Sequence, residues 1–439
     1  MSSSLRASQI KSPEYVGKQV TIRGWVYRLR KQKENSFVLV RDDRGGVIQC
    51  VIGTAKAANL TIESSIEITG MVSQDPRAPE GGYEIKGSSI KVYNIAGTDY
   101  PIGEFQSDEL LLDKRHLALR TRRMVAIAKI RAKLLDYCRQ WFVSNDWMEV
   151  TAPTIVKGAV EGGSTLFKLK YFDEEAFLSQ SAQLYLEAMI FSLGPVWSLT
   201  PSFRAEKSRT VRHLAEFSHL EAEAPWVSLE DILQVQERLV SHAIQGTIKD
   251  CAEELALLKR DTADLKKVEP PFERVPYPKA IELLRSKGFM IAEEEDGGGK
   301  REIRVGDDLS IDSERELTKN SEKPIFVVGY PMAVKPFYVK EDPESPGIGL
   351  AADMLAPRGF GEITSGGLRE DDISAITGRM KKEGLDPDSY QWYLDLRRYG
   401  SVPHGGFGLG IERLMRWITD VEDIKDTVLF PRTMSRAYP

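Results

Sequence analysis

The chain has 439 residues, of which 41% are hydrophobic and 28% are charged, and its formal net charge is −5. This length allows two or three domains with sizeable cores, no apolar run reaches membrane-spanning length, and the mild negative charge restricts any nucleic-acid contact to a local basic surface. Only three widely separated cysteines occur (Cys50, Cys138 and Cys251), which excludes a disulfide framework or a Cys-x-x-Cys zinc site and predicts a reducing, cytoplasmic setting.

The first hundred residues contain short hydrophobic runs separated by Gly, Asp and Pro turns. Strands are expected at residues 20–27, 36–40, 47–51, 65–72 and 83–92. Five such strands predict a small closed barrel of the oligonucleotide-binding (OB) kind. Basic residues gather beside the second strand, at Arg23, Arg28, Arg30, Lys31 and Lys33. On charge alone, a nucleic-acid face and an ordinary solvated strand pair explain this cluster equally well.

Helical spacing of apolar residues appears next, from about 127 to 144. Ile130, Leu134, Cys138 and Phe142 fall on one face of this helix. The segment that follows, 145–153, ends at a proline. Further helices are expected at 229–248 and at about 252–265.

The window from 203 to 217 combines arginine, glutamate, histidine and aromatic residues over two expected strands joined by a basic turn. It reads Phe203-Arg-Ala-Glu206, then Arg212-His213 and Phe217. Cations for phosphates and a flat ring for a base are what a nucleoside triphosphate requires. The strand period places Phe217, His219, Glu221 and Glu223 on one face. A solvated hairpin of mixed charge is the alternative for this window taken alone.

Alternating glycines mark the C-terminal region, in Gly406-Phe-Gly408-Leu-Gly410. Glycine at every second position lets a strand approach a ligand or another backbone closely. The pattern then becomes helical, which places Arg413 at a strand-to-helix junction. The run fails the Gly-x-Gly-x-x-Gly dinucleotide fingerprint because Ile411 replaces the third glycine, and the chain has no phosphate loop of the Gly-x-x-x-x-Gly-Lys type.

Together, the helix ending at Pro153, the 203–217 window and the 406–413 window resemble motifs 1, 2 and 3 of the class II aminoacyl-tRNA synthetases. They are most similar to the aspartyl/asparaginyl subgroup of archaeal and eukaryote-like type. The resemblance implies an α+β protein, with an OB-fold anticodon-binding barrel at 1–103, a hinge at 104–125 and a catalytic domain at 126–439. That domain would hold an antiparallel sheet flanked by helices and a helical insertion at about 228–325. It also implies a homodimer formed around Pro153.

The family resemblance implies adenylate formation from ATP with Mg²⁺. Arg204 is expected at the α-phosphate, His213 and Arg413 at the outer phosphates, Phe217 on the adenine and Glu206 at its exocyclic amine. The full set expected to bind the nucleotide is Arg204, Glu206, Arg212, His213, Phe217, Glu362, Gly410 and Arg413. Asp353, Glu362 and Ser365 look like the magnesium ligands, because hard oxygens suit this ion; a polar loop is the alternative.

The amino-acid pocket expected from the family comprises Glu161, Gln183, Leu186, Glu221, Arg369 and His404. Aspartyl members carry a lysine where this chain has Leu186, and usually an Asp in place of Glu221. Arg369 can donate to a side-chain carbonyl, and Glu221 can accept from a carboxamide. Like charges in a partly desolvated pocket would disfavour aspartate. The expected reaction is therefore ligation of L-asparagine to tRNA(Asn) through an adenylate.

Three other functions are alternatives to this one. The first is aspartate–tRNA ligation, perhaps on both tRNAs, against which Leu186 and Glu221 speak. The second is a tRNA-independent amidating ligase, whose relatives lack the barrel. The third is a non-catalytic regulator, whose relatives lose motif 2 or 3 residues that this chain keeps. By resemblance, the barrel would read the anticodon with Phe37 stacking on a base and Arg30 and Gln49 reading base edges. No membrane association is expected.

Overall fold

The computed structural model describes residues 4–103, 105–158, 166–206, 211–292 and 299–439. The chain divides into two compact units, the first ending at Val125 and the second running from Ala126 to Tyr438. Within the described ranges, no helix is long and apolar enough to cross a membrane.

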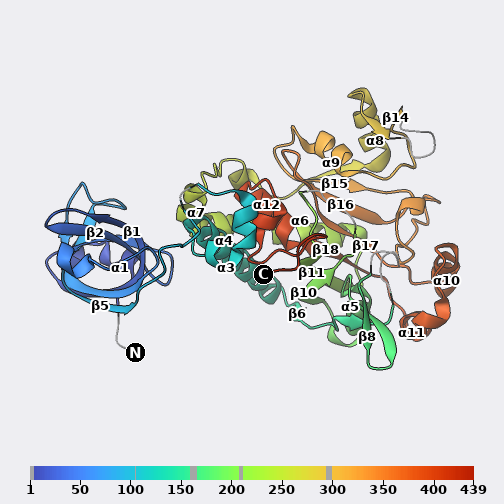
Figure 1. Cartoon of the computed structure of the whole chain (residues 1–439). Helices are drawn as coiled ribbons and strands as arrows, with labels where there is room; N and C mark the ends of the chain where they lie inside the picture. The colour runs from blue at the N-terminus through green and yellow to red at the C-terminus, as the bar shows by residue number, and fades with distance from the viewer. Residues whose placement is uncertain (1–3, 104, 159–165, 207–210, 293–298) are drawn as a thin grey trace. The chain divides into compact units, whose positions relative to one another are not determined.

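A closed five-stranded barrel forms most of the first unit (Figure 1). The strands are β1 (Gln19–Lys31), β2 (Asn35–Arg41), β3 (Val47–Gly53), β4 (Ser65–Gln74) and β5 (Tyr83–Asn94). Their order around the barrel is β1-β2-β3-β5-β4, and only the β3–β5 pair is parallel. The predicted five-stranded closed barrel is confirmed, and the strands are somewhat longer than predicted.

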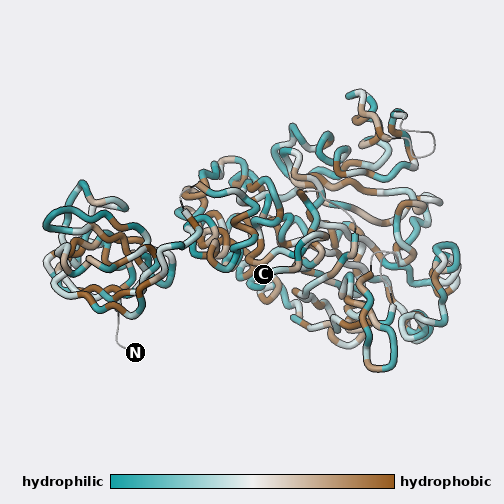
Figure 2. The backbone as a smooth tube through the Cα atoms, in the orientation of Figure 1, coloured by the Kyte–Doolittle hydropathy of each residue, from teal (hydrophilic) through white to brown (hydrophobic). Residues whose placement is uncertain are grey.

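The barrel closes because alternate strand residues are apolar and point inward. On β2 these are Val38 and Val40, and on β3 they are Ile48, Cys50 and Ile52, all at most 1% exposed. Figure 2 shows hydrophobic positions recurring along these strands. Short elements complete the unit: α1 (Ala7–Ile10), η1 (Pro13–Tyr15), η2 (Thr54–Ala57), α2 (Asp108–Asp113) and α3 (Arg115–Ala118).

Helix α4 (Arg122–Ser144) begins five residues before the predicted start at 127 and ends where predicted. Its apolar face is the predicted one, since Ile130, Leu134, Cys138 and Phe142 are all buried. Phe142 stacks on Trp197 of the central sheet at a centroid distance of 4.7 Å. This helix is therefore fixed to the sheet by its hydrophobic stripe.

An eight-stranded sheet organises the second unit, in the order β12-β15-β16-β17-β18-β11-β10-β6. The strands are β6 (Met148–Glu149), β10 (Val196–Phe203), β11 (Glu216–Pro225), β12 (Glu273–Pro276), β15 (Ile325–Val328), β16 (Ala351–Ala356), β17 (Gly361–Leu368) and β18 (His404–Gly410). The six strands from β15 to β10 pair antiparallel, whereas the edge strands β12 and β6 pair parallel with their neighbours. The antiparallel sheet flanked by helices that the sequence predicted is confirmed.

The segment 228–325, predicted to be a helical insertion, also contributes to the large sheet and packs on it. Its first helix, α6 (Leu229–Asp250), packs on the sheet, and the Thr364 hydroxyl of β17 donates a hydrogen bond to Gln236 of α6. Its strand β12 forms the edge of the same sheet. Apolar spacing shows that a helix has a buried face but not which surface covers it.

The remaining helices lie around this sheet (Figure 1). They are α5 (Gln183–Leu193), α7 (Ala252–Leu257), η4 (Leu265–Lys267), α8 (Tyr277–Ser286), α9 (Ile311–Thr318), η5 (Met332–Val334), α10 (Ile373–Lys382), η6 (Pro387–Tyr390), α11 (Gln391–Arg398), α12 (Ile411–Thr419) and η7 (Ile424–Thr427). Two small sheets complete the unit, one of β7 (Ile155–Val156), β8 (Lys168–Tyr171) and β9 (Glu174–Leu178), the other of β13 (Met290–Ala292) and β14 (Lys300–Glu302).

Candidate active site

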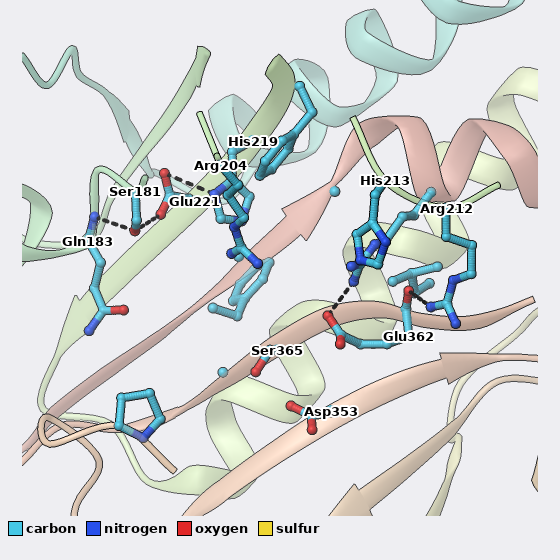
Figure 3. A pocket seen from close by; sticks show the side chains of 18 of the residues that line it. Ser181, Gln183, Arg204, Arg212, His213, His219, Glu221, Asp353, Glu362 and Ser365 are labelled. Atoms are coloured by element: carbon cyan, nitrogen blue, oxygen red, sulfur yellow. Dashed lines mark hydrogen bonds and ion pairs between the residues drawn. The ribbon is translucent and has the colours of Figure 1, made fainter. Parts of the chain in front are cut away.

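A cavity of about 260 Å³ lies over the middle of the large sheet, with walls from β11, β16, β17 and β18 and from the start of α5 (Figure 3). Phe217, His219, Glu221 and Glu223 of β11 all line it. The prediction that these four alternate residues share one face of the strand is therefore confirmed. A sheet face with an aromatic ring, an imidazole and two carboxylates is equipped to bind a polar ligand.

The glycines of β18 allow β11 to lie directly against this strand. A Cβ atom at Gly406 would overlap the Ala222 carbonyl and the Glu223 carboxylate, and one at Gly408 would overlap the His219 ring. Gly408 and Gly410 also line the cavity. At the alternating glycines, part of the cavity floor is therefore main chain without side chains. Their spacing predicted such a close approach to a neighbouring strand.

One end of the cavity is cationic (Figure 3). The Arg204 guanidinium lies 5.5 Å from the centre of the Phe217 ring, and His213 Nε2 lies 3.8 Å from Glu206. Arg413 donates to Glu362 at 2.6 Å. Burial and then the nearby Arg413 lower the pKa of His213, which favours a neutral imidazole at neutral pH. These groups can bind polyanionic phosphates next to an aromatic surface.

The carboxylates of β16 and β17 lie beside this cationic end. Asp353 is opposite Ser365 in the strand register, and Glu362 precedes Ser365 on β17. Lys335 Nζ donates to Asp353 Oδ2 at 2.8 Å, whereas Asp353 Oδ1 is buried and has no hydrogen-bond partner among the described residues. Burial acts to raise the pKa of Glu362, but Arg413, Arg212 and Lys335 lower it on balance. Ionised Glu362 and the orphaned oxygen of Asp353 fit a hard cation.

No three His, Cys, Asp or Glu side chains of the described ranges converge as a metal cage. Mg²⁺ does not require such a cage, because phosphates and water supply most of its ligands in nucleotide sites. Asp353, Glu362 and Ser365 are the oxygen-bearing side chains that such an ion would find here.

The opposite end of the cavity is formed by Ser181, Gln183, Glu221, Glu223 and Arg369. Arg369 Nε donates to Glu223 Oε1 at 3.1 Å, and its Nη2 donates to the same oxygen. Nη1 of Arg369 donates to no described residue. Burial, only partly offset by Arg369, raises the pKa of Glu223 to about 7. An arginine with one free edge above a buried carboxylate can recognise a carbonyl oxygen.

Residues 107–434 match the family model described as tRNA synthetases class II (D, K and N). The chain belongs to the class II tRNA synthetases. A second family model, an OB-fold nucleic acid binding domain, matches residues 20–93 of this synthetase.

Curated relatives and solved structures of synthetases agree with this assignment. The asparagine–tRNA ligase of Thermococcus gammatolerans is 50% identical over 435 residues, 97% of each chain. The crystal structure of asparaginyl-tRNA synthetase from Pyrococcus horikoshii complexed with asparaginyl-adenylate has a TM-score of 0.94 at 48% identity and covers 100% of both chains. The Entamoeba histolytica asparaginyl-tRNA synthetase in complex with asparaginyl-adenylate has a TM-score of 0.86 at 36% identity, over 96% of this chain and 97% of that one.

Most residues predicted for the synthetase site line the cavity. They are Gln183, Arg204, Glu206, Arg212, His213, Phe217, Glu221, Asp353, Glu362, Ser365, Arg369, Gly410 and Arg413. Arg212, predicted to bind the nucleotide, also donates to Glu314 at 2.9 Å and to the Glu362 carbonyl at 3.2 Å. Arg212 therefore holds Glu362 in place. Glu161 lies outside the described residues.

Two predicted amino-acid contacts of the synthetase need correction. Leu186 does not line the cavity and packs in an apolar cluster with Ala152, Ile190 and Val196, because the turn of α5 directs it away from the site. His404 lies behind the cavity wall, where its Nε2 is 3.2 Å from Glu187. Neither side chain lines the cavity.

Glu221, predicted to accept from a carboxamide, lines the cavity and also has hydrogen-bond partners within the protein. Its Oε1 accepts from the Ser181 hydroxyl, and its Oε2 accepts from the Ala182 backbone amide at 2.8 Å. His219 Nδ1 also lies 3.4 Å from Oε2. Ser181 therefore fixes the direction in which Glu221 can accept.

Sequence reasoning missed Lys335 and Asp308 of the synthetase cavity and the buried Glu187 behind it. Lys335 lies in the run Lys335-Pro-Phe-Tyr338. A charged residue directly before an aromatic run was the sequence signal that could have identified Lys335. Asp308 and Glu187 had no such signal. Tyr393, Arg397 and His404, which contact Glu187, lie 206, 210 and 217 residues away in sequence.

On the barrel of the synthetase, Arg30, Phe37 and Gln49 share the outer face of β1, β2 and β3. Arg30 pairs with Phe37 across the strands, and its guanidinium lies 4.8 Å from the ring centre. Gln49 is only 8% exposed and donates to Glu84 at 2.8 Å. The first two residues are available to a single-stranded ligand, whereas Gln49 must keep or exchange this contact to read a base.

Proposed function

We propose that this synthetase ligates L-asparagine to tRNA(Asn) through an asparaginyl-adenylate. This proposal rests on asparagine–tRNA ligases that are about 50% identical to this chain over nearly its whole length. It also rests on the structural similarity to two complexes with asparaginyl-adenylate. In the first step the asparagine carboxylate attacks the α-phosphate of ATP and pyrophosphate leaves. In the second step a terminal ribose hydroxyl of the tRNA attacks the activated carbonyl and AMP leaves.

The residues of the cavity supply alignment and charge, not a covalent nucleophile. Arg204 binds the α-phosphate, where negative charge accumulates in the transition state. Arg413 and His213 bind the outer phosphates, and Phe217 stacks on the adenine, whose amine donates to Glu206. Asp353, Glu362 and Ser365 would hold Mg²⁺, which supplies further neutralisation of phosphate charge when bound.

The opposite end selects the amino acid. Arg369 Nη1 donates to the carbonyl oxygen of the asparagine side chain, and Glu221 accepts from its amide nitrogen. A second carboxylate in this position would face Glu221 and Glu223 beside Arg369. That arrangement disfavours aspartate.

Amino-acid-dependent exchange of pyrophosphate into ATP tests the function, with L-asparagine and L-aspartate compared side by side. Exchange with asparagine alone is expected. Exchange with aspartate alone would keep the adenylation chemistry and overturn the selectivity, whereas exchange with neither would refute the proposal.

The first unit would bind the anticodon, with the barrel at 1–103 and a hinge at 104–125 before the catalytic domain at 126–439. We expect Phe37→Ala to weaken tRNA binding by about 1–3 kcal/mol, because one stacked base is lost. Pyrophosphate exchange without tRNA should not change. Binding of labelled tRNA measures the first quantity; Tyr93→Ala, which removes an exposed aromatic of β5, is the matched control. Equal effects of both variants would exclude a specific role for Phe37.

Motif 1 would form a homodimer interface. Val143, Met148 and Ile155 are exposed apolar residues near Pro153, and β6 lies at the edge of the large sheet. Exposed apolar groups beside a sheet edge favour association. Sedimentation at micromolar concentration should give twice the 49.3 kDa chain mass, and a monomer would contradict this proposal. The cytoplasm is the expected location, where translation consumes the product.

A further inference from the structure

Glu187 of α5 lies fully buried directly behind the amino-acid end of the cavity and does not line it. Its Oε1 accepts from Gln183 Nε2 at 3.0 Å. Its Oε2 accepts from Arg397 Nη2 and from the Tyr393 hydroxyl, each at 2.7 Å, and lies 3.2 Å from His404 Nε2. The mechanism above assigns no role to this carboxylate.

The contact with Glu187 decides which way the amide of Gln183 faces. An ionised carboxylate only accepts hydrogen bonds, so the NH₂ group of Gln183 must point toward it and the carbonyl oxygen must point away. Gln183 lines the cavity, and its Oε1 accepts from no described residue. Gln183 therefore presents an acceptor to the cavity, which suits the α-ammonium group of an amino acid.

The same carboxylate is tied to the segment that carries Arg369. Arg397, which donates to Glu187, also donates from Nε to the Glu370 carbonyl at 2.9 Å. The Arg369 backbone amide donates to the His404 carbonyl at 2.9 Å. Glu187 therefore contacts Gln183 on one side of the amino-acid end and, through Arg397, the segment that carries Arg369 on the other.

Glu187 is ionised in this position. Burial acts to raise the pKa of its carboxyl, but Arg397, His404 and Arg369 outweigh burial and lower it on balance. A fixed anion here can orient an amide without itself gaining a proton at neutral pH.

We propose that Glu187 is a positioning residue. It holds the Gln183 carbonyl toward the α-ammonium of asparagine and links Gln183 to the segment that carries Arg369. This inference rests on the proposed function, because it assigns the amino-acid end of that site. It assigns Gln183 to the ammonium and not to the carboxylate of the substrate.

The substitution Glu187→Gln tests the orientation directly. The new amide oxygen would take the place of Oε2, where three donors converge, and its NH₂ would then face Gln183. Gln183 would have to turn its own NH₂ into the cavity, against the ammonium. The KM for asparagine should rise about tenfold to a hundredfold, as expected for a hydrogen bond to a charged group, while the KM for ATP stays within about twofold. Glu175→Gln, an exposed residue paired with Lys168, is the control.

Succinamic acid, which is asparagine without its α-amine, separates positioning from general damage. Titration calorimetry should show weaker asparagine binding to Glu187→Gln but unchanged succinamic acid binding. A parallel loss for both ligands, or no loss for either, would overturn the proposal.

A double variant, Glu187→Gln with Arg397→Met, removes both buried charges and guards against misfolding of the single variant. The asparagine defect should persist in it, whereas recovery of wild-type affinity would show that Glu187 only balances Arg397. Absence of asparagine-dependent exchange in the wild-type enzyme would refute the proposed function itself. Normal wild-type exchange with an unaltered variant would refute only this positioning role.

Discussion

Arg204→Ala is expected to reduce kcat for asparagine-dependent pyrophosphate exchange by about 10²–10³-fold, the typical effect of removing one group that stabilises developing charge. The KM for ATP should change much less, because Arg413 and His213 remain to bind the outer phosphates. Arg204→Lys keeps the charge but loses the planar fork, so an intermediate loss is expected.

Arg398→Ala provides the control for this experiment. Arg398 is an exposed arginine of α11 that pairs with Asp395, away from the cavity. It should leave exchange unchanged. A loss of less than about threefold in Arg204→Ala would place the reacting phosphate elsewhere in the cavity.

Arg369→Met should abolish asparagine activation and also destabilise the fold by about 3–5 kcal/mol, since it leaves a buried carboxylate without its partner. Glu223 is 1% exposed, and its pKa is already raised to about 7. Without the guanidinium that pKa rises further. An acid whose folded pKa exceeds its unfolded pKa loses stability as pH rises between the two values. Urea unfolding should therefore show a larger loss at pH 8 than at pH 5.

The double variant Arg369→Met with Glu223→Gln separates the two effects. Both charges are then absent, so most of the stability should return while asparagine activation stays undetectable. Recovery of activation in the double variant would exclude Arg369 from substrate recognition. An equal loss of stability at both pH values would exclude a charged Glu223 as its cause.

The barrel and the central strands were predictable from sequence because local patterns determine them. Alternating apolar residues set the β2 and β3 faces, and the glycines of β18 require a close neighbour. The place of 228–325 was not predictable in this way. Its helix α6 meets β17 through Gln236 and Thr364, which are 128 residues apart, and no local pattern identifies such a partner.

The residues of the catalytic cavity were likewise predictable only where a local pattern determines them. Phe217, His219, Glu221 and Glu223 were found by strand period alone. The direction of each side chain depended on distant groups: Ser181 orients Glu221, and Arg397 orients Glu187 across 210 residues. Leu186 was assigned to the pocket by position in a motif, but the turn of α5 places it in the apolar core.

The backbone floor of the cavity limits how its selectivity can be re-engineered. Gly408 lines the cavity and Gly406 lies two residues before it on β18, and any larger residue at either position would collide with β11. Room for a bulkier amino acid must therefore be gained from the walls, at Val334 or Tyr338 for instance. A selection for variants that charge a larger amino acid should recover substitutions in those walls and leave both glycines unchanged.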